Sequence, residues 1–119
     1  MELNGLVMDV HNNTKAKGFY DDINRVIAHL AEYPEDQEFV RGLWVSTRLM
    51  LIVSELGEAL EGLRDGNYSD TPKSGGVAEE LADATIRIAD LSKDIGFNLE
   101  HAIRNKHLYN LTHHGRKTL

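Results

Sequence analysis

The chain has 119 residues, of which 41% are hydrophobic, so it can bury one hydrophobic core, and we expect a single domain over residues 1–119. It contains no cysteine, which excludes disulfides, thiolate zinc sites and a cysteine nucleophile. The formal net charge of −6 argues against binding to a nucleic-acid polymer, whereas a small anionic ligand is compatible with acidic residues that bind cations.

The sequence predicts no contact with a membrane. No segment approaches the roughly 20 consecutive apolar residues that a helix needs to cross a bilayer. The N-terminal sequence MELNGLVMDVHNN lacks the basic stretch and long apolar run of a signal peptide. We therefore expect a cytoplasmic protein.

The first part of the chain predicts two helices. Apolar periodicity indicates one helix over about residues 6–16, closed at residues 17–18. A second helix is expected to begin at Asp21 or Asp22, either of which can cap it, and to run to about Tyr33. The proline that follows interrupts the helical pattern, so a turn is expected there.

The longest predicted element is a helix over residues 35–64. Its apolar residues recur at steps of three and four on one face, which is typical of a helix packed against a neighbour. They are Leu49, Ile52, Leu56, Ala59 or Leu60, and Leu63. A single small chain has too little other surface to cover so long a helix, and we therefore expect a homodimer or a larger homo-oligomer.

The remaining sequence predicts a loop and two further helices. Residues 65–76 are rich in Gly, Ser and Asp and indicate a surface loop. A helix is expected over residues 77–96, and Asn98 is positioned to cap a last helix that runs to about Leu111. Residues 113–117 have no apolar stripe and are expected to be loosely ordered. No segment alternates like a strand, so the fold class is all-α.

Two pairs of acidic residues are the most distinctive feature of the sequence. Glu55 and Glu58 lie in the long helix, and Glu80 and Asp83 lie in the helix after the loop. Residues three apart are neighbours on a helix surface, so each pair directs two carboxylates to one side. If the two helices pack antiparallel across the loop, the pairs face each other and repel unless a cation lies between them.

Mg²⁺ suits such a cluster, because it binds oxygen ligands and commonly shares its coordination shell between carboxylates, waters and phosphates. Mn²⁺ has similar preferences and can substitute. Glu61 extends the first pair by one step and is expected to be an auxiliary ligand, whereas Glu79 points away from Glu80. The alternative is an ordinary solvated helix face, on which acids three residues apart are common.

The sequence around these acids resembles a known family. The blocks LMLIVSELGEALEGLR and EELADATIRIADLSKDIGFNLEHAIRNKHLYNLT are similar to the MazG-like nucleotide pyrophosphohydrolases, of the all-α nucleoside triphosphate pyrophosphatase superfamily. That family has an E-x-x-E motif followed by E-x-x-D. The segment VHNNTKAKGFYDD resembles the start of small phage- and mobile-element-type members.

The resemblance implies a four-helix-type bundle that assembles into a homodimer or homotetramer, with the nucleotide near a subunit interface. It implies Mg²⁺ bound by Glu55, Glu58, Glu80 and Asp83. The implied reaction is hydrolysis of a (deoxy)nucleoside triphosphate to monophosphate and pyrophosphate, as nucleotide-pool house-cleaning. Glu55 or Glu58 is the expected catalytic carboxylate nearest the attacking water.

The resemblance also implies substrate-binding residues near the end of the last helix. Lys106, Tyr109 and Asn110 match an element that contacts the triphosphate or the sugar. The family often continues with Thr-Arg-Pro, whereas Thr112 is followed here by two histidines. Tyr109 is equally compatible with ordinary helix packing.

Other residues have alternative interpretations. Phe19, Tyr20 and Trp44 could stack on a nucleobase, but aromatic residues in helical seams more often belong to the core. Arg87 is expected to form a structural ion pair with Asp83 or Asp90 along its own helix. For the whole chain, the alternative to an enzyme is a non-catalytic helical oligomer that binds nucleotide or a protein partner.

Overall fold

A computed structural model describes residues 2–113, and in this range the chain forms helices and no strand. The helices are α1 (Leu3–Ala16), α2 (Asp21–His29), α3 (Pro34–Arg64), α4 (Val77–Ile95) and α5 (Leu99–His113). The predicted all-α class and the order of the elements are confirmed. Of the tail that we expected to be loosely ordered, His113 ends α5 and residues 114–117 lie outside the described residues.

Local signals explain where most helices begin and end. Gly96 closes α4 with a φ of 99°, a left-handed conformation that glycine adopts without a steric penalty. The Asn98 side-chain Oδ1 accepts a hydrogen bond from the His101 backbone N–H at 3.0 Å, which confirms the predicted cap of α5.

The predicted boundaries of α2 are wrong in two respects. Asp21 and Asp22 do not cap the helix but lie in its first turn, where a carboxylate interacts favourably with the helix dipole. The helix also ends at His29 rather than Tyr33. The residue before a proline disfavours the helical conformation, and Tyr33 accordingly adopts φ −127° and ψ 74° before Pro34.

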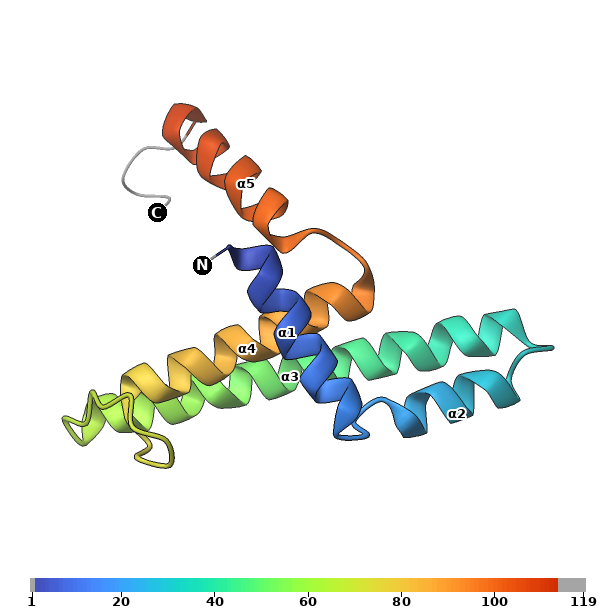
Figure 1. Cartoon of the computed structure of the whole chain (residues 1–119), viewed down its shortest axis with the longest axis horizontal. Helices are drawn as coiled ribbons and strands as arrows, with labels where there is room; N and C mark the ends of the chain where they lie inside the picture. Colours follow the sequence, from blue (N-terminus) through green and yellow to red (C-terminus); the bar gives the residue numbers. More distant parts are fainter. Residues whose placement is uncertain (1, 114–119) are drawn as a thin grey trace.

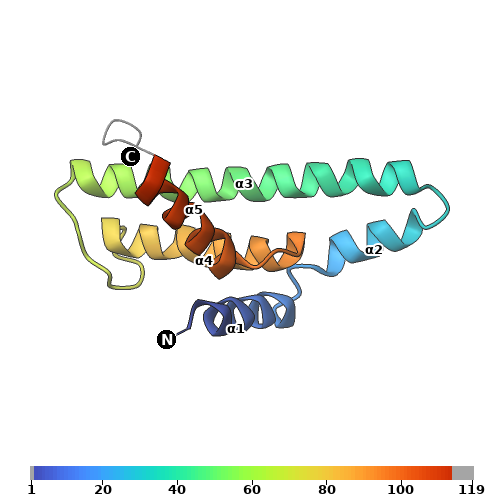
Figure 2. The same ribbon diagram turned by 90° about the horizontal axis from the view of Figure 1, so that it is seen from above.

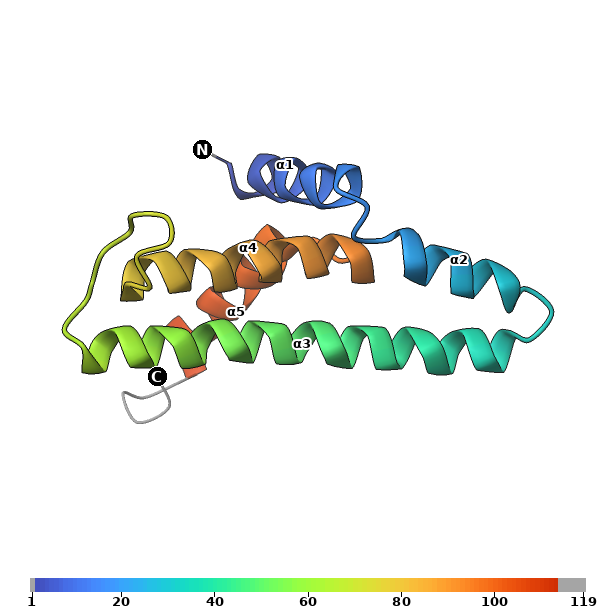
Figure 3. The same ribbon diagram turned by 90° about the horizontal axis from the view of Figure 1, so that it is seen from below.

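The helices form three layers (Figures 1–3). Helices α3 and α4 are antiparallel and are joined by the loop of residues 65–76. Helix α4 packs along the C-terminal half of α3 and α2 lies along its N-terminal half, while α1 crosses α4 on the side away from α3. Helix α5 projects from the end of α4 and packs mainly on α1 (Figure 1).

The face of α3 that meets α4 is made of small and charged residues. Its buried residues are Arg48, Glu55, Ala59 and Gly62. A Cβ atom at Gly62 would lie 2.7 Å from the Gly75 carbonyl oxygen, so glycine is needed for the loop to approach α3. Close packing of this face brings the Glu55 side chain between the two helices.

The predicted apolar stripe of α3 therefore does not face α4. Leu56 and Leu60 are 47% and 49% exposed, and Leu49 and Leu63 are exposed to a similar degree. Only Ala59 of that stripe is buried. The face of α3 that packs on α4 instead carries Arg48 and Glu55, which pair with Asp90 and Arg87 of α4, and the apolar face is left outside. Large apolar patches on a small protein commonly mark an interaction surface.

An apolar cluster joins α2 to α3. Tyr20, Ile23 and Ile27 are buried, and Val40 and Trp44 of α3 pack against them. This cluster fixes the N-terminal half of α3. None of the described helices is long and apolar enough to cross a membrane.

Candidate metal centre

Three of the four predicted acids converge between α3 and α4. Glu55 on α3 and Glu80 and Asp83 on α4 each place a carboxylate oxygen within 4.8 Å of the others. Glu55 and Glu80 are buried, whereas Asp83 is half-buried. We refer to Glu55, Glu80 and Asp83 as the acidic cluster.

Glu58 and Glu61 lie at the edge of this cluster on the side of the loop. Both are exposed, and together with Glu80 and residues of the loop they line a pocket of about 250 Å³. Glu58 is near enough to Glu80 to raise its pKa. The structure therefore places the fourth predicted ligand beside the cluster but outside the set of mutually close oxygens.

Glu80 carries the clearest indication that a ligand belongs in the cluster. The residue is only 6% exposed, and its Oε2 atom has no hydrogen-bond partner among the described residues. A buried carboxylate oxygen without a donor is costly, because it has lost its contact with water and gained nothing in return. A cation between the acids would remove that cost.

The pKa values of the three carboxyl groups are pushed apart. The Glu55 carboxylate, which accepts a hydrogen bond from Glu80 when Glu80 is protonated, raises the pKa of Glu80 to about 7, and burial and Glu58 add to this. Burial and the negative charges of Glu55 and Glu79 raise the pKa of Asp83. Without a cation, the cluster therefore holds a proton close to neutral pH.

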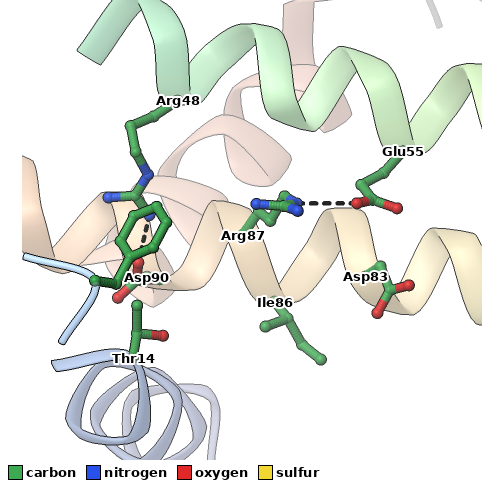
Figure 4. A pocket seen from close by; sticks show the side chains of 8 residues that line it. Thr14, Arg48, Glu55, Asp83, Ile86, Arg87 and Asp90 are labelled. Atoms are coloured by element: carbon green, nitrogen blue, oxygen red, sulfur yellow. Dashed lines mark hydrogen bonds and ion pairs between the residues drawn. The ribbon is translucent and has the colours of Figure 1, made fainter. Parts of the chain in front are cut away.

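Glu55 differs from its two neighbours because an arginine supports its charge. Burial opposes its ionisation, but the hydrogen bond from Arg87, with a further contribution from Glu80 in its protonated form, outweighs burial and lowers the pKa of Glu55. Arg87 Nε donates to Glu55 Oε1 at 3.0 Å (Figure 4). The predicted pairing of Arg87 with Asp83 or Asp90 along α4 is therefore wrong, because the carboxylate on the facing helix is better placed.

A pocket of about 390 Å³ opens beside the cluster, between α1, α3 and α4 (Figure 4). It contains two arginines, three carboxylates and an aromatic ring. Its lining residues are Thr14, Phe19, Arg48, Glu55, Asp83, Ile86, Arg87 and Asp90. The pocket is thus continuous with the acidic cluster and offers cationic groups to an anionic ligand.

A buried polar network forms the wall of this pocket opposite the cluster. Asp90 accepts hydrogen bonds from the Tyr20 hydroxyl at 2.7 Å and from Arg48, and its other oxygen lies 2.8 Å from His11 Nδ1. Arg48 Nη1 also donates to the Tyr20 oxygen at 2.8 Å. Burial raises the pKa of Tyr20 well above its usual value, so it remains a neutral donor.

We did not predict this network from the sequence, although the spacing of Arg48 and Asp90 from the acidic pairs indicates it. Arg48 lies seven residues before Glu55, and Asp90 lies seven residues after Asp83. Two helical turns separate such residues, so they share a face. An arginine and an aspartate on the same faces as the two acidic pairs were therefore candidates for a second contact between the helices.

The aromatic residues have different environments. Tyr20 is buried and Trp44 packs against the apolar cluster, so both belong to the core. Phe19 lines the pocket and is 39% exposed, with the Arg48 guanidinium carbon 4.9 Å from its ring centre. Phe19 is therefore the only one of the three that offers a ring to a ligand in this pocket.

The predicted substrate-binding residues do not lie beside the acidic cluster of the same chain. Lys106, Tyr109 and Asn110 lie on α5, which points away from the α3–α4 pair (Figure 1). Lys106 Nζ lies 4.7 Å from the centre of the Tyr109 ring, and that ring stacks on His113. None of the three lines the pocket beside the cluster.

No protein-family model matches this chain, and no match was found among curated proteins or solved structures. The resemblance to the MazG-like family therefore rests on the motifs of the sequence and stays a prediction.

Proposed function

We propose that this chain is a Mg²⁺-dependent MazG-like hydrolase that converts (deoxy)nucleoside triphosphates to monophosphates and pyrophosphate. The observation that carries the proposal is the buried, unpartnered Glu80 oxygen in a cluster of acids that opens onto a pocket with two arginines. A solvated helix face does not account for it, because Glu55 and Glu80 are buried.

The donor set fits Mg²⁺ or Mn²⁺. Glu55, Glu80 and Asp83 would hold the ion, and Glu58 at the edge would complete the set through its own carboxylate or through water. All the donors are oxygen atoms, which favours hard cations over zinc or iron. When bound, the ion supplies neutralisation of the phosphate charges.

The chain's own residues would supply binding and proton transfer. Arg87 presents a partly exposed guanidinium group to the pocket, and such a group can bind a phosphate through two parallel hydrogen bonds, whereas Arg48 is buried in the pocket wall. Glu55 or Glu58 would orient the attacking water and accept its proton. The water oxygen forms a bond to phosphorus as the bond to the bridging oxygen breaks, and the electron pair leaves with pyrophosphate.

The exposed apolar faces support assembly into a homodimer or homotetramer. Leu56 and Leu60 are about half exposed on α3, and Leu108 and Leu111 are exposed on α5. Burial of such residues contributes about 25 cal/mol per Å². Assembly would also give Lys106 and its neighbours on α5 a route to the pocket of another copy.

A pyrophosphate-release assay with Mg²⁺ across a panel of ribo- and deoxynucleoside triphosphates tests this function. We expect turnover of at least one triphosphate by the wild type and none by Glu80→Gln. Glu38→Gln, which changes an exposed acid of the same long helix, is the matched control and should retain activity.

The same assay identifies the alternative. Binding of a nonhydrolysable triphosphate in calorimetry, without pyrophosphate release from any substrate, would indicate a non-catalytic nucleotide-binding oligomer. No binding and no release would reject both nucleotide functions.

A further inference from the structure

One cationic side chain pairs with the acidic cluster in the part of the chain that the structure describes. Among the described residues, Arg87 makes the only ion pair with a carboxylate of the cluster, from Nε to Glu55 Oε1 at 3.0 Å. It lies on α4 one turn after Asp83, so the same side chain reaches between the helices and into the pocket. The Glu80 Oε2 atom, which is buried without a partner, shows that this single arginine does not satisfy the cluster.

The two arginines of the pocket are held very differently. The Arg48 side chain is 4% exposed and is bound by Asp90, Asp94 and the Tyr20 hydroxyl. The Arg87 side chain is 35% exposed and has one ion pair. A partly exposed ion pair contributes little to stability, because water screens it and the side chain loses conformational freedom. Arg48 is therefore a fixed part of the wall, whereas Arg87 can leave its partner at small cost.

Arg87 and a divalent cation compete for the same carboxylate. A cation held by the cluster would need the charge of Glu55, with which Arg87 already pairs at 3.0 Å, and the guanidinium would repel that cation. The divalent ion has twice the charge and two further carboxylates to bind it. Exchange of Arg87 for the ion is thus favoured when the ion is present.

We propose that Arg87 is an exchangeable counter-ion: it neutralises Glu55 in the metal-free protein, and a divalent cation displaces it into the pocket, where it binds phosphate oxygens of the substrate. This inference rests on the proposed metal-dependent function. It makes Arg87 a substrate-binding residue that becomes free for the triphosphate only when the metal is in place, so that metal binding prepares the pocket for the anion.

The proposal predicts three effects of removing the charge of Arg87, and their signs differ. The metal-free protein should lose only a little stability, because the partly exposed pair between Arg87 and Glu55 contributes little to it. The divalent cation should bind more tightly, by about two- to fivefold, because it no longer displaces an arginine. The KM for the triphosphate should rise, because the pocket loses the guanidinium group that binds the phosphate oxygens. A fixed Arg87 would also repel the cation, so the movement of the Arg87 side chain is what separates an exchangeable ion pair from a purely structural one.

The experiment compares the wild type with Arg87→Gln and Arg87→Lys by calorimetric titration with Mn²⁺ and with Mg²⁺. Arg25→Gln is the control, because Arg25 forms an exposed ion pair with Asp22 on α2. We expect tighter binding in Arg87→Gln only, with Arg87→Lys and the control close to the wild type. Equal or weaker binding by Arg87→Gln would overturn the exchange.

A measurement on the wild type keeps the test decisive if Arg87→Gln does not fold. The Nε–H resonance of Arg87 should be protected from exchange with water in the metal-free protein and should shift and lose protection as Mg²⁺ saturates the site. Saturation with an unmoved Arg87 signal would reject the exchange alone. No Mg²⁺ or Mn²⁺ binding at millimolar concentration would reject the metal site and the exchange together, which distinguishes the two failures.

Discussion

Replacement of Glu80 by Gln separates a metal-binding cluster from a merely structural one. Between the usual pKa of 4.5 and about 7, the folded protein holds a proton on Glu80 that the unfolded chain releases. The free energy of unfolding therefore falls as the pH rises through this range and stays lowered above it. A glutamine at position 80 does not ionise, so the variant does not lose stability in this way. We expect metal-free Glu80→Gln to melt higher than the wild type above pH 7, and the difference to vanish below pH 4.5.

The same substitution should remove the response to metal. Mg²⁺ at about 100 times its Kd raises the melting temperature of a domain of this size by roughly 10 °C, through binding to the folded state only. Glu80→Gln removes one of three close ligands. Mg²⁺ should therefore raise the melting temperature of the variant by only a small fraction of the increase seen in the wild type. Stability without metal and response to metal thus change in opposite directions.

Melting curves at pH 4, 5, 6, 7 and 8, with and without Mg²⁺, measure both effects, and pyrophosphate release measures function on the same samples. Glu38→Gln controls for loss of an acidic charge on the surface. A Glu80→Gln variant that melts lower than the wild type at pH 8 without metal, or that keeps the full Mg²⁺ increment, would refute the cluster as a cation site.

Three other predictions concern the pocket wall, the cofactor and the assembly. Tyr20→Phe removes hydrogen bonds to the buried Arg48 and Asp90 and should lower the free energy of unfolding by about 2 kcal/mol in urea denaturation, whereas Tyr68→Phe, on an exposed residue, should have no effect. Chelation with EDTA should abolish hydrolysis and added Mg²⁺ or Mn²⁺ should restore it; undiminished turnover after exhaustive chelation would contradict this. Light scattering should show a dimer or larger at micromolar concentration, and Leu60→Glu on the exposed stripe should shift it towards the monomer; a monomeric wild type would count against the assembly.

The local features of this protein could be predicted from its sequence. Helix ends depend on a few neighbouring residues, and the glycine at Gly96, the cap at Asn98 and the proline at Pro34 accordingly mark real boundaries. The spacing of Glu80 and Asp83 also placed both carboxylates on one side of α4, because the helical repeat determines which residues share a face.

Only the tertiary structure decided which face of each helix meets a neighbour. The apolar stripe of α3 predicted an inward-facing seam, but Glu55, Arg48 and small residues occupy the interface with α4. Periodicity identifies a face without identifying its partner. The partners of the inward face are Arg87 and Asp90 of α4 and Tyr20 just before α2, which lie far away in the sequence. For the same reason Arg87 pairs with Glu55 on the facing helix rather than with an aspartate of its own helix. Contacts between distant residues depend on packing and on charge pairing across helices, and no local pattern contains them.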